Sequence, residues 1–239
     1  MKKKMKNIAA ILGCILLISG AFSGCKPEQE NNNPVNLPKN PEMIGNGIQN
    51  ISVNTTDVDF IKEGKTEYTV VIPQETTDIV KNAAQELLYF VYEASGLSLP
   101  VITDEEVEYS STAKYISLGN TDVAQDANIS ADYSIVGSNG YIVKTQGQSV
   151  FCIGGGDYGT LYSIYEFLEH MFGYEIYATD EIVLEKNVKN KKLLDFDVTV
   201  RPTFQWRHIA FGKVDHDTTQ QMRFRELAPN SMFIRVNGG

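Results

Sequence analysis

The sequence predicts an α+β domain: a mixed sheet with two helices packed on one face. Two observations lead to this fold class. Short runs rich in β-branched residues alternate with turn signals, and two longer segments repeat apolar residues every three or four positions. A third observation limits the domain, because the pattern changes after Pro202 from hairpins to a strand–helix–strand order.

The first helix is predicted from about Thr76 to Ser95, after a strand over Tyr68–Ile72 that Pro73 ends. Gly96 stands where a helix C-cap glycine is expected. The apolar residues of this helix share one face: Ile79, Val80, Ala83, Ala84, Leu87, Leu88 and Val91.

Extended segments follow over Leu97–Ile102 and Lys114–Leu118, the second of which ends at Gly119. Two further strands, Tyr141–Thr145 and Ser149–Ile153, flank a short turn that contains a glycine. This spacing predicts a β-hairpin.

The second helix is predicted from about Gly159 to Phe172, with Gly173 closing it. Short strands are expected over Tyr174–Ala178 and Asp180–Leu184. Its buried face is predicted to consist of Leu161, Ile164, Tyr165, Leu168 and Phe172. A final extended run, Val198–Val200, leads to Arg201 and Pro202.

Residues 201–239 are expected to be the first part of a truncated (β/α)8 barrel. Trp206–Phe211 has the pattern of a strand, 218–227 that of a helix, and 231–236 that of a second strand. A complete barrel needs about 250 residues.

The N-terminus predicts export. Residues 1–24 combine four lysines, an apolar run from Ile8 to Ile18 and small residues, as in a signal peptide. Phe22-Ser-Gly-Cys25 resembles a bacterial lipobox, which implies lipidation at Cys25; a plain secretory signal with an incidental cysteine is the alternative. Residues 25–49 are rich in Asn and Pro and predict a flexible tether, so the α+β domain spans 50–200.

Charge argues against a nucleic-acid partner. Without the four lysines of the signal, 17 basic residues face 30 acidic ones, a net charge of −13. The one cysteine beyond Cys25, Cys152, lies in an apolar strand and is expected to be a small core residue.

Residues 154–159, GGGDYG, satisfy the dinucleotide motif G-x-G-x-x-G, and Glu175 lies near the spacing of a ribose-binding acid. The loop nevertheless comes late in the chain and after a hairpin, with little sequence left for a nucleotide domain. We expect a tight strand-to-helix corner whose glycines allow positive φ and close approach of helix and strand. No cofactor is expected.

The segment from Gly154 to Gly173 resembles the non-catalytic α+β domains that precede the barrels of family 67 α-glucuronidases and family 20 β-hexosaminidases. It looks closest to the bacterial family called domain of unknown function 4838. Further matching residues lie at 83–87, 115–119, 140–142 and 201–207, and the resemblance covers roughly residues 66–212. It implies a fold like the second domain of hexosaminidases.

The resemblance also implies one substrate-binding residue. In hexosaminidases an arginine in the Pro-x-Phe-x-x-Arg join contacts a sugar hydroxyl, and Arg207 occupies that position. His208 departs from the glycine of that family, and a salt bridge at the domain junction is an equal alternative for Arg207. Trp206 is expected in the core rather than stacked on a sugar.

No catalytic or metal-binding residue is expected in this chain. Glycoside hydrolysis needs two carboxylates beside the scissile bond, and the candidate pairs are Glu166/Glu169, Asp195/Asp197 and Asp215/Asp217. We expect Glu166 and Glu169 to be solvated, and Asp215-His-Asp217 to be a polar loop. His170 suits a helix C-terminus without any function.

Together these features predict the N-terminal, non-catalytic part of a lipid-anchored, carbohydrate-active protein that acts in polysaccharide metabolism. The resemblance places the catalytic acids in the missing part of the barrel, which would also bind the carbohydrate. The expected location is the outer side of the bacterial cell membrane. The alternative is a stand-alone glycan-binding surface lipoprotein without catalysis.

Overall fold

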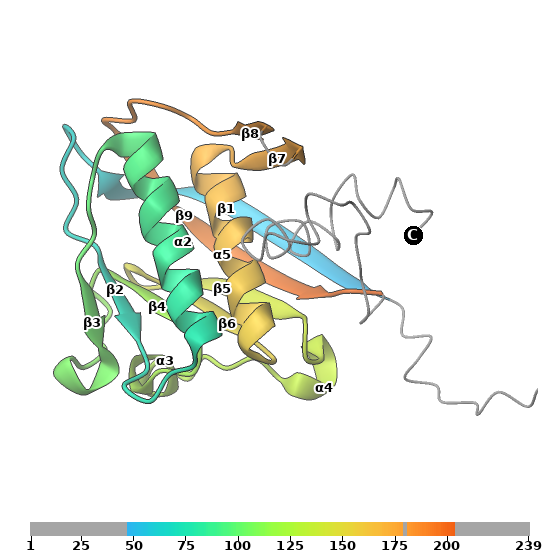
Figure 1. Ribbon diagram of the computed structural model, residues 1–239. Coiled ribbons are helices and arrows are strands. Elements are labelled where there is room, and N and C mark those ends of the chain that lie inside the picture. Colours follow the sequence, from blue (N-terminus) through green and yellow to red (C-terminus); the bar gives the residue numbers. More distant parts are fainter. Residues whose placement is uncertain (1–46, 179–180, 204–239) are drawn as a thin grey trace, which may run out of the picture. The chain divides into compact units, whose positions relative to one another are not determined.

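A seven-stranded mixed sheet organises residues 47–178 and 181–203, the part of the chain that this computed structural model describes (Figure 1). The strands of this sheet are β1 (Ile48–Ile61), β2 (Thr69–Ile72), β3 (Val101–Thr103), β4 (Tyr115–Leu118), β5 (Tyr141–Gln146), β6 (Ser149–Gly154) and β9 (Lys191–Arg201). A separate two-stranded sheet joins β7 (Glu175–Ala178) and β8 (Glu181–Val183). The helices are α2 (Asp78–Ser95), a 3-10 turn η1 (Asp104–Glu106), α3 (Asp122–Asp126), α4 (Tyr133–Val136) and α5 (Asp157–Phe172).

The predicted α+β class is confirmed, and the sheet is mixed as expected. Its strand order is β1-β9-β5-β6-β4-β2-β3. The first four strands pair antiparallel, whereas β6, β4, β2 and β3 run parallel. Strand β6 therefore joins an antiparallel half to a parallel half, and its six residues are buried.

Most predicted elements occur close to their expected bounds. The hairpin β5–β6 turns at Gly147, which has φ +62°. Helix α2 begins after the N-cap Thr77 and ends at Gly96, whose left-handed conformation closes the helix. Helix α5 ends at Gly173 in the same way, but it begins at Asp157, two residues before the predicted start.

Two apolar clusters occupy the two faces of the sheet. Helices α2 and α5 lie side by side over one face, as predicted (Figure 1). The smaller cluster on the other face includes Phe151 and Ile153 of β6, Val123 and Ala124 of α3 and Val136 of α4. Alternate residues of β6 thus enter opposite clusters, which is why this strand is apolar throughout.

The long antiparallel pair of β1 and β9 is absent from the sequence-based prediction. Strand β1 begins at Ile48, inside the last two residues of the predicted tether, and runs to Ile61. Strand β9 continues the expected run at Val198–Val200 back to Lys191. Polar residues dominate β1, so its alternation of apolar and polar side chains is weak.

The glycine-rich loop is a strand-to-helix corner in which backbone packs directly on backbone. A Cβ added at Gly155 would lie 2.0 Å from the carbonyl oxygen of Gly137, and one at Gly159 would lie 2.2 Å from that of Gly140. The expected close approach is therefore present. The expected positive φ is wrong, because none of the four glycines between 154 and 159 has one.

Replacing Gly155 with alanine is expected to destabilise the chain by about 1–3 kcal/mol or more, because a backbone oxygen occupies the space that the new methyl group needs. Gly156→Ala is the matched control: its Cβ meets the nearest atom, the Ser138 carbonyl oxygen, at 2.9 Å, so its cost should be smaller. Urea unfolding of the two variants measures the difference. An equal loss of stability in the two variants would contradict the conclusion that backbone packing at Gly155 requires a glycine.

Candidate functional site

The residues to which the sequence assigned binding or modification lie outside the described part of the chain. These are Cys25 and Arg207. Trp206, His208 and the pair Asp215/Asp217, to which no binding role was assigned, lie outside the described residues as well. The predicted barrel start at 201–239 is described only as far as Thr203. The lipidation and sugar contact assigned to Cys25 and Arg207 therefore stay predictions.

Glu166 of α5 lies at the centre of a buried polar cluster. Its side chain is 1% exposed. The hydroxyl of Tyr141 donates a hydrogen bond to Oε2 at 2.8 Å, and Nε2 of His170 lies 3.1 Å from Oε1. The expectation that Glu166 is solvated is wrong, and Glu169, three residues later, is half-buried.

A second buried carboxylate joins the two long helices. Glu86 of α2 is 8% exposed, and the hydroxyl of Tyr165 on α5 donates a 2.8 Å hydrogen bond to its Oε2. The Tyr165 ring also stacks on Tyr174, with centroids 5.5 Å apart. Each carboxylate therefore accepts a hydrogen bond from a tyrosine hydroxyl, which offsets part of the free-energy cost of burying the carboxylate.

Electrostatics around α5 favour a positive charge on His170. The hydrogen bond that its Nε2 donates to the Glu166 carboxylate raises the pKa of this imidazole, the charges of Glu166 and Glu169 raise it further, and burial acts in the opposite direction. The pKa of Glu169 is raised as well, first by burial and then by the nearby Glu166 carboxylate. Glu166, Glu169 and His170 therefore lie close together along one helix, α5.

This cluster does not have the geometry for glycoside hydrolysis. A catalytic pair needs two carboxylates open to a sugar on either side of the bond, whereas both oxygens of Glu166 are engaged inside the protein. Asp195 and Asp197 of β9 are exposed, and Asp197 forms a 3.0 Å ion pair with Lys144 on the neighbouring strand β5. The candidate pairs within the described residues thus have structural or solvated positions.

The glycine corner likewise does not present a phosphate cradle. Carbonyl oxygens of Gly137, Ser138 and Gly140 occupy the space beside Gly155, Gly156 and Gly159, so this corner is packed against backbone. Glu175, considered as a ribose-binding acid, is exposed on β7 and accepts a hydrogen bond from Tyr177.

Two further observations concern possible ligands. Within 47–178 and 181–203, no three His, Cys, Asp or Glu side chains gather as a metal site would require. Burial raises the pKa of the Cys152 thiol, which is fully buried, as its predicted role in the core requires.

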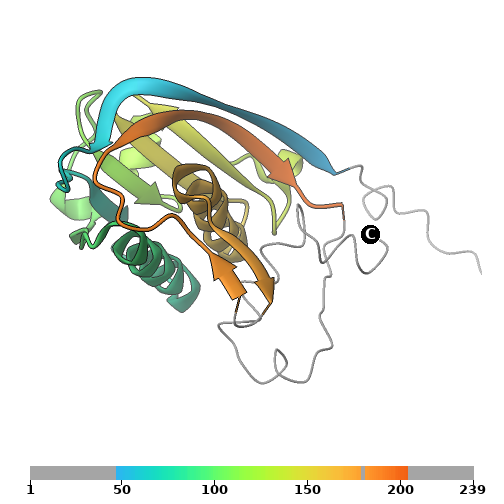
Figure 2. The same cartoon turned by 90° about the horizontal axis from the view of Figure 1, so that it is seen from above.

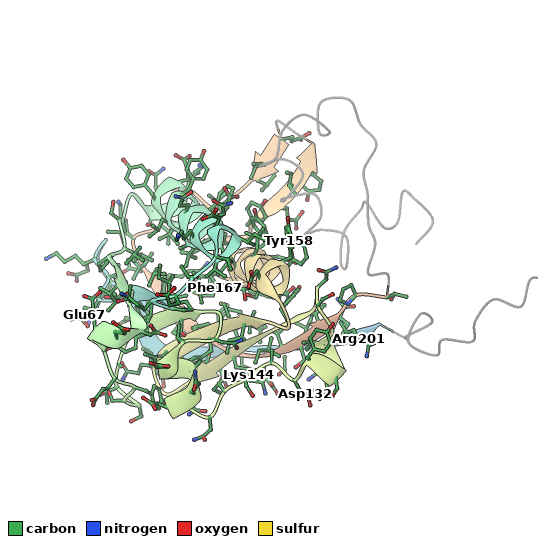
Figure 3. All side chains as sticks on the ribbon, turned by 60° about the horizontal axis from the view of Figure 1, so that its bottom comes forward. Glu67, Asp132, Lys144, Tyr158, Phe167 and Arg201 are labelled. Carbon is green, nitrogen blue, oxygen red and sulfur yellow. The ribbon has the colours of Figure 1, made fainter. Side chains whose placement is uncertain are left out.

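A polar hollow of about 400 Å³ lies between the end of β1 and the start of β4. It is lined by Asp59, Phe60, Lys62, Glu63, Lys65, Thr66, Glu67 and Lys114. Ion pairs join Lys114 to Glu67 and Lys62 to Asp59 across this surface. Figure 3 shows Glu67 at one end of the molecule and Arg201 at the other.

The chain enters and leaves the domain at the same corner. Ile48 of β1 pairs with Arg201 of β9, and a Cβ on Gly47 would meet Oγ1 of Thr203 at 2.4 Å. The guanidinium of Arg201, which is labelled in Figure 3, donates a hydrogen bond of 3.3 Å to the carbonyl oxygen of Ser134 in α4. Whatever precedes residue 47 and follows residue 203 is therefore attached at one point of the sheet.

Sequence reasoning missed the buried carboxylates, although signals for both were present. Glu86 lies at helical spacing from Ala83 and Phe90, within the apolar face of α2. Glu166 lies four residues before His170, which is the spacing of an acid–base pair on one helix face.

His170 is expected to make stability depend on pH. Because its pKa in the folded chain is raised above the ordinary value of 6.5, its contribution is complete below pH 6.5 and is lost as pH rises through the folded value. Urea unfolding of the full chain should show this loss. In both His170→Gln and Glu166→Gln, the free energy of unfolding should depend less on pH over the range in which His170 loses its proton. An unchanged pH dependence in His170→Gln would show that His170 is not the group responsible.

Comparison with known proteins gives a match that covers less than half of the chain. Residues 60–167 match the family described as "Glycosyl hydrolase family 67 N-terminus". A comparison with curated proteins found no match.

Three of the solved structures that match this chain are the following. A GH20 β-N-acetylhexosaminidase from Streptomyces coelicolor is 14% identical over 65% of this chain and 26% of its own, with a TM-score of 0.42. A GH20 exo-β-N-acetylglucosaminidase from Vibrio harveyi is 16% identical over 65% and 19%, with a TM-score of 0.39. A family GH115 4-O-methyl-α-glucuronidase is 15% identical over 46% and 14%, with a TM-score of 0.33.

The matched region thus spans about a quarter or less of each of these proteins. The predicted resemblance to the N-terminal domain of family 67 α-glucuronidases is confirmed by the family match over residues 60–167.

Proposed function

We propose that this chain is the N-terminal, non-catalytic part of a carbohydrate-active protein that resembles glycoside hydrolases such as α-glucuronidases and acts in polysaccharide metabolism. The observation that carries the proposal is the family match over residues 60–167, which begins at the end of β1 and ends within α5. Catalytic acids are proposed to lie outside the described residues, in the barrel that the resemblance implies.

The buried carboxylates support a non-catalytic role for the domain. Burying an ionised carboxylate is costly unless it is paired and hydrogen-bonded. Both Glu86 and Glu166 have tyrosine partners, and these hydrogen bonds join α2 to α5 and α5 to β5. A domain with this interior suits the support of a neighbouring domain better than substrate turnover.

The shared corner supports a flanking position for the domain. Because β1 begins beside the end of β9, the length of the sheet does not separate the preceding tether from the following segment. The domain would therefore flank a direct connection between the membrane and the barrel. Arg207, six residues beyond the exit at Arg201, is proposed to contact sugar at the mouth of that barrel.

Lipidation at Cys25 is proposed to hold the chain at the outer side of the cell membrane. Among the described helices, none is both long and apolar enough to cross a bilayer. The predicted tether, residues 25–49, would span roughly 25–30 Å as a flexible coil, which is enough to keep the domain clear of the lipid headgroups.

A second candidate function is glycan binding by the domain alone. The polar hollow beside Glu67 and Lys114 is the observation that favours it, because its side chains offer hydrogen-bond donors and acceptors to hydroxyl groups. Many of these donors and acceptors are already engaged in ion pairs within the hollow. We therefore rank glycan binding second.

The proposal predicts no glycosidase activity in the chain as given. Aryl α-glucuronides, aryl β-N-acetylhexosaminides and aldouronic acids are the substrates to assay. Turnover that persists in purified protein and disappears in Glu166→Gln would contradict the non-catalytic assignment. Calorimetric binding of oligosaccharides that Lys114→Ala abolishes would instead favour the second candidate.

Lipid anchoring is tested by fractionation of cells that express the full chain. Wild-type protein is expected in the membrane fraction, and Cys25→Ala is expected to move to the soluble exported fraction because it lacks the acylated sulfur. Cys152→Ala is the control, since that thiol is buried in the core and should leave the distribution unchanged. An identical distribution of wild type and Cys25→Ala would exclude the anchor.

A further inference from the structure

Strand β1 forms one edge of the seven-stranded sheet, with β9 as its neighbour (Figure 2). An edge strand presents a row of backbone N–H and C=O groups that can pair with another strand, and proteins usually protect such edges. The opposite edge is protected because its strand, β3, is only three residues long and leads into the acidic turn at 104–106.

The protective features of β1 all lie in its second half. Register shifts interrupt its pairing with β9 between Thr55 and Ile61, and the charged residues Asp57 and Asp59 occur there. By contrast, residues 48–55 pair with β9 in an unbroken register and contain no charge, proline or bulge. Residues 50–55 of this edge are regular and neutral, and no strand among the described residues pairs with their outer side.

The sequence of this half is almost symmetric about its centre. Asn50-Ile51-Ser52-Val53-Asn54 reads nearly the same in both directions. In an antiparallel pair with Ser52 opposite Ser52, Ile51 of one strand lies opposite Val53 of the other and Asn50 lies opposite Asn54. Such like-with-like pairs stabilise neighbouring strands.

The two faces of the strand fit this pairing. Val53 packs against the larger apolar cluster, and Ile51, on the same side of the strand, is 39% exposed. On the other side, Nδ2 of Asn54 lies 3.5 Å from Oγ of Ser52. A second β1 strand would therefore extend the apolar row on one face and the amide and hydroxyl row on the other.

We infer that β1 pairs with β1 of a second copy of this chain, antiparallel about a two-fold axis at Ser52, so that one sheet continues through both copies. A two-fold interface requires a surface that is complementary to itself, and residues 50–54 meet that requirement. Their neutrality also matters, because both copies are strongly acidic and a charged edge would repel.

Disruption of the edge is the first test. In Ser52→Lys two ammonium groups would face each other across the axis, so the dimer dissociation constant should rise on the order of tenfold. Ser52→Thr keeps a hydroxyl and favours strands, so it should dimerise like wild type. Sedimentation equilibrium of the full chain in detergent, over a concentration series, measures both, and melting curves verify that each variant folds.

Disulfide trapping tests the register. Directly opposed residues of antiparallel strands have Cβ atoms about 4.5–5.5 Å apart, close enough for a disulfide after small adjustment. Ser52→Cys should therefore form a cross-linked dimer under mild oxidation. Asn54→Cys is the matched control: its counterpart would be displaced by four residues, about 13 Å, and should remain uncross-linked.

Three results would overturn the inference. These are a wild-type chain that stays monomeric at every concentration, a dimer that is unaffected by Ser52→Lys, and cross-linking that is as efficient in Asn54→Cys as in Ser52→Cys. Binding of a different strand at this edge, from this chain or another protein, would give the first or the third result.

Discussion

The packing of the glycine corner on the segment before β5 is the constraint from which the rest of the domain follows. Gly155 and Gly159 bring their backbone against the carbonyl oxygens of Gly137 and Gly140. Helix α5 and strand β5 therefore start side by side, since Tyr141 directly follows Gly140. Glu166 lies about two and a half turns along α5, where the Tyr141 hydroxyl donates a hydrogen bond to it. A substituent at the corner would separate these elements, so small residues are a requirement of the packing rather than of ligand binding.

The same corner connects the interior to the exit of the chain. Helix α4 ends at Val136, immediately before the carbonyl groups that the glycines contact, and its Ser134 accepts a hydrogen bond from Arg201. Strand β5 pairs with β9 on its other side. The orientation in which the chain leaves the sheet thus depends on α4 and β5, which are both positioned by the glycine corner.

The sequence predicted those elements whose local signals agree with their packing. Helix α2 has one apolar face and capping residues at both ends, and the hairpin β5–β6 has a glycine at its turn. Strand β1 could not be predicted from alternation, because residues 49–52, 54 and 55 are all exposed and only Val53 among them is partly buried against the core. Helices α3 and α4 have five and four residues, which is too short for a periodic pattern.

The candidate site was predicted less completely, for a physical reason. Helix α5 is buried on nearly all sides, so its polar residues cannot be sorted into a solvent face by periodicity. Glu166 was placed in solvent for that reason, whereas its tyrosine partner lies 25 positions away in sequence. The family resemblance was found because it depends on the order of short motifs, and this order does not require knowledge of side-chain burial.

The proposed lipid anchor at Cys25 and the proposed pairing of two β1 strands support each other. If two β1 strands pair about Ser52, the residues at position 48 of the two copies lie eight positions apart along the paired strands, about 27 Å. The two tethers then start on one sheet and each spans roughly 25–30 Å, so both lipids can enter the same membrane. Attachment to one membrane raises the effective concentration of the strands for each other, and two lipids hold a dimer more firmly than one lipid holds a monomer. Membrane attachment would therefore favour the dimer, and the dimer would favour attachment, through the strand that directly follows the tether.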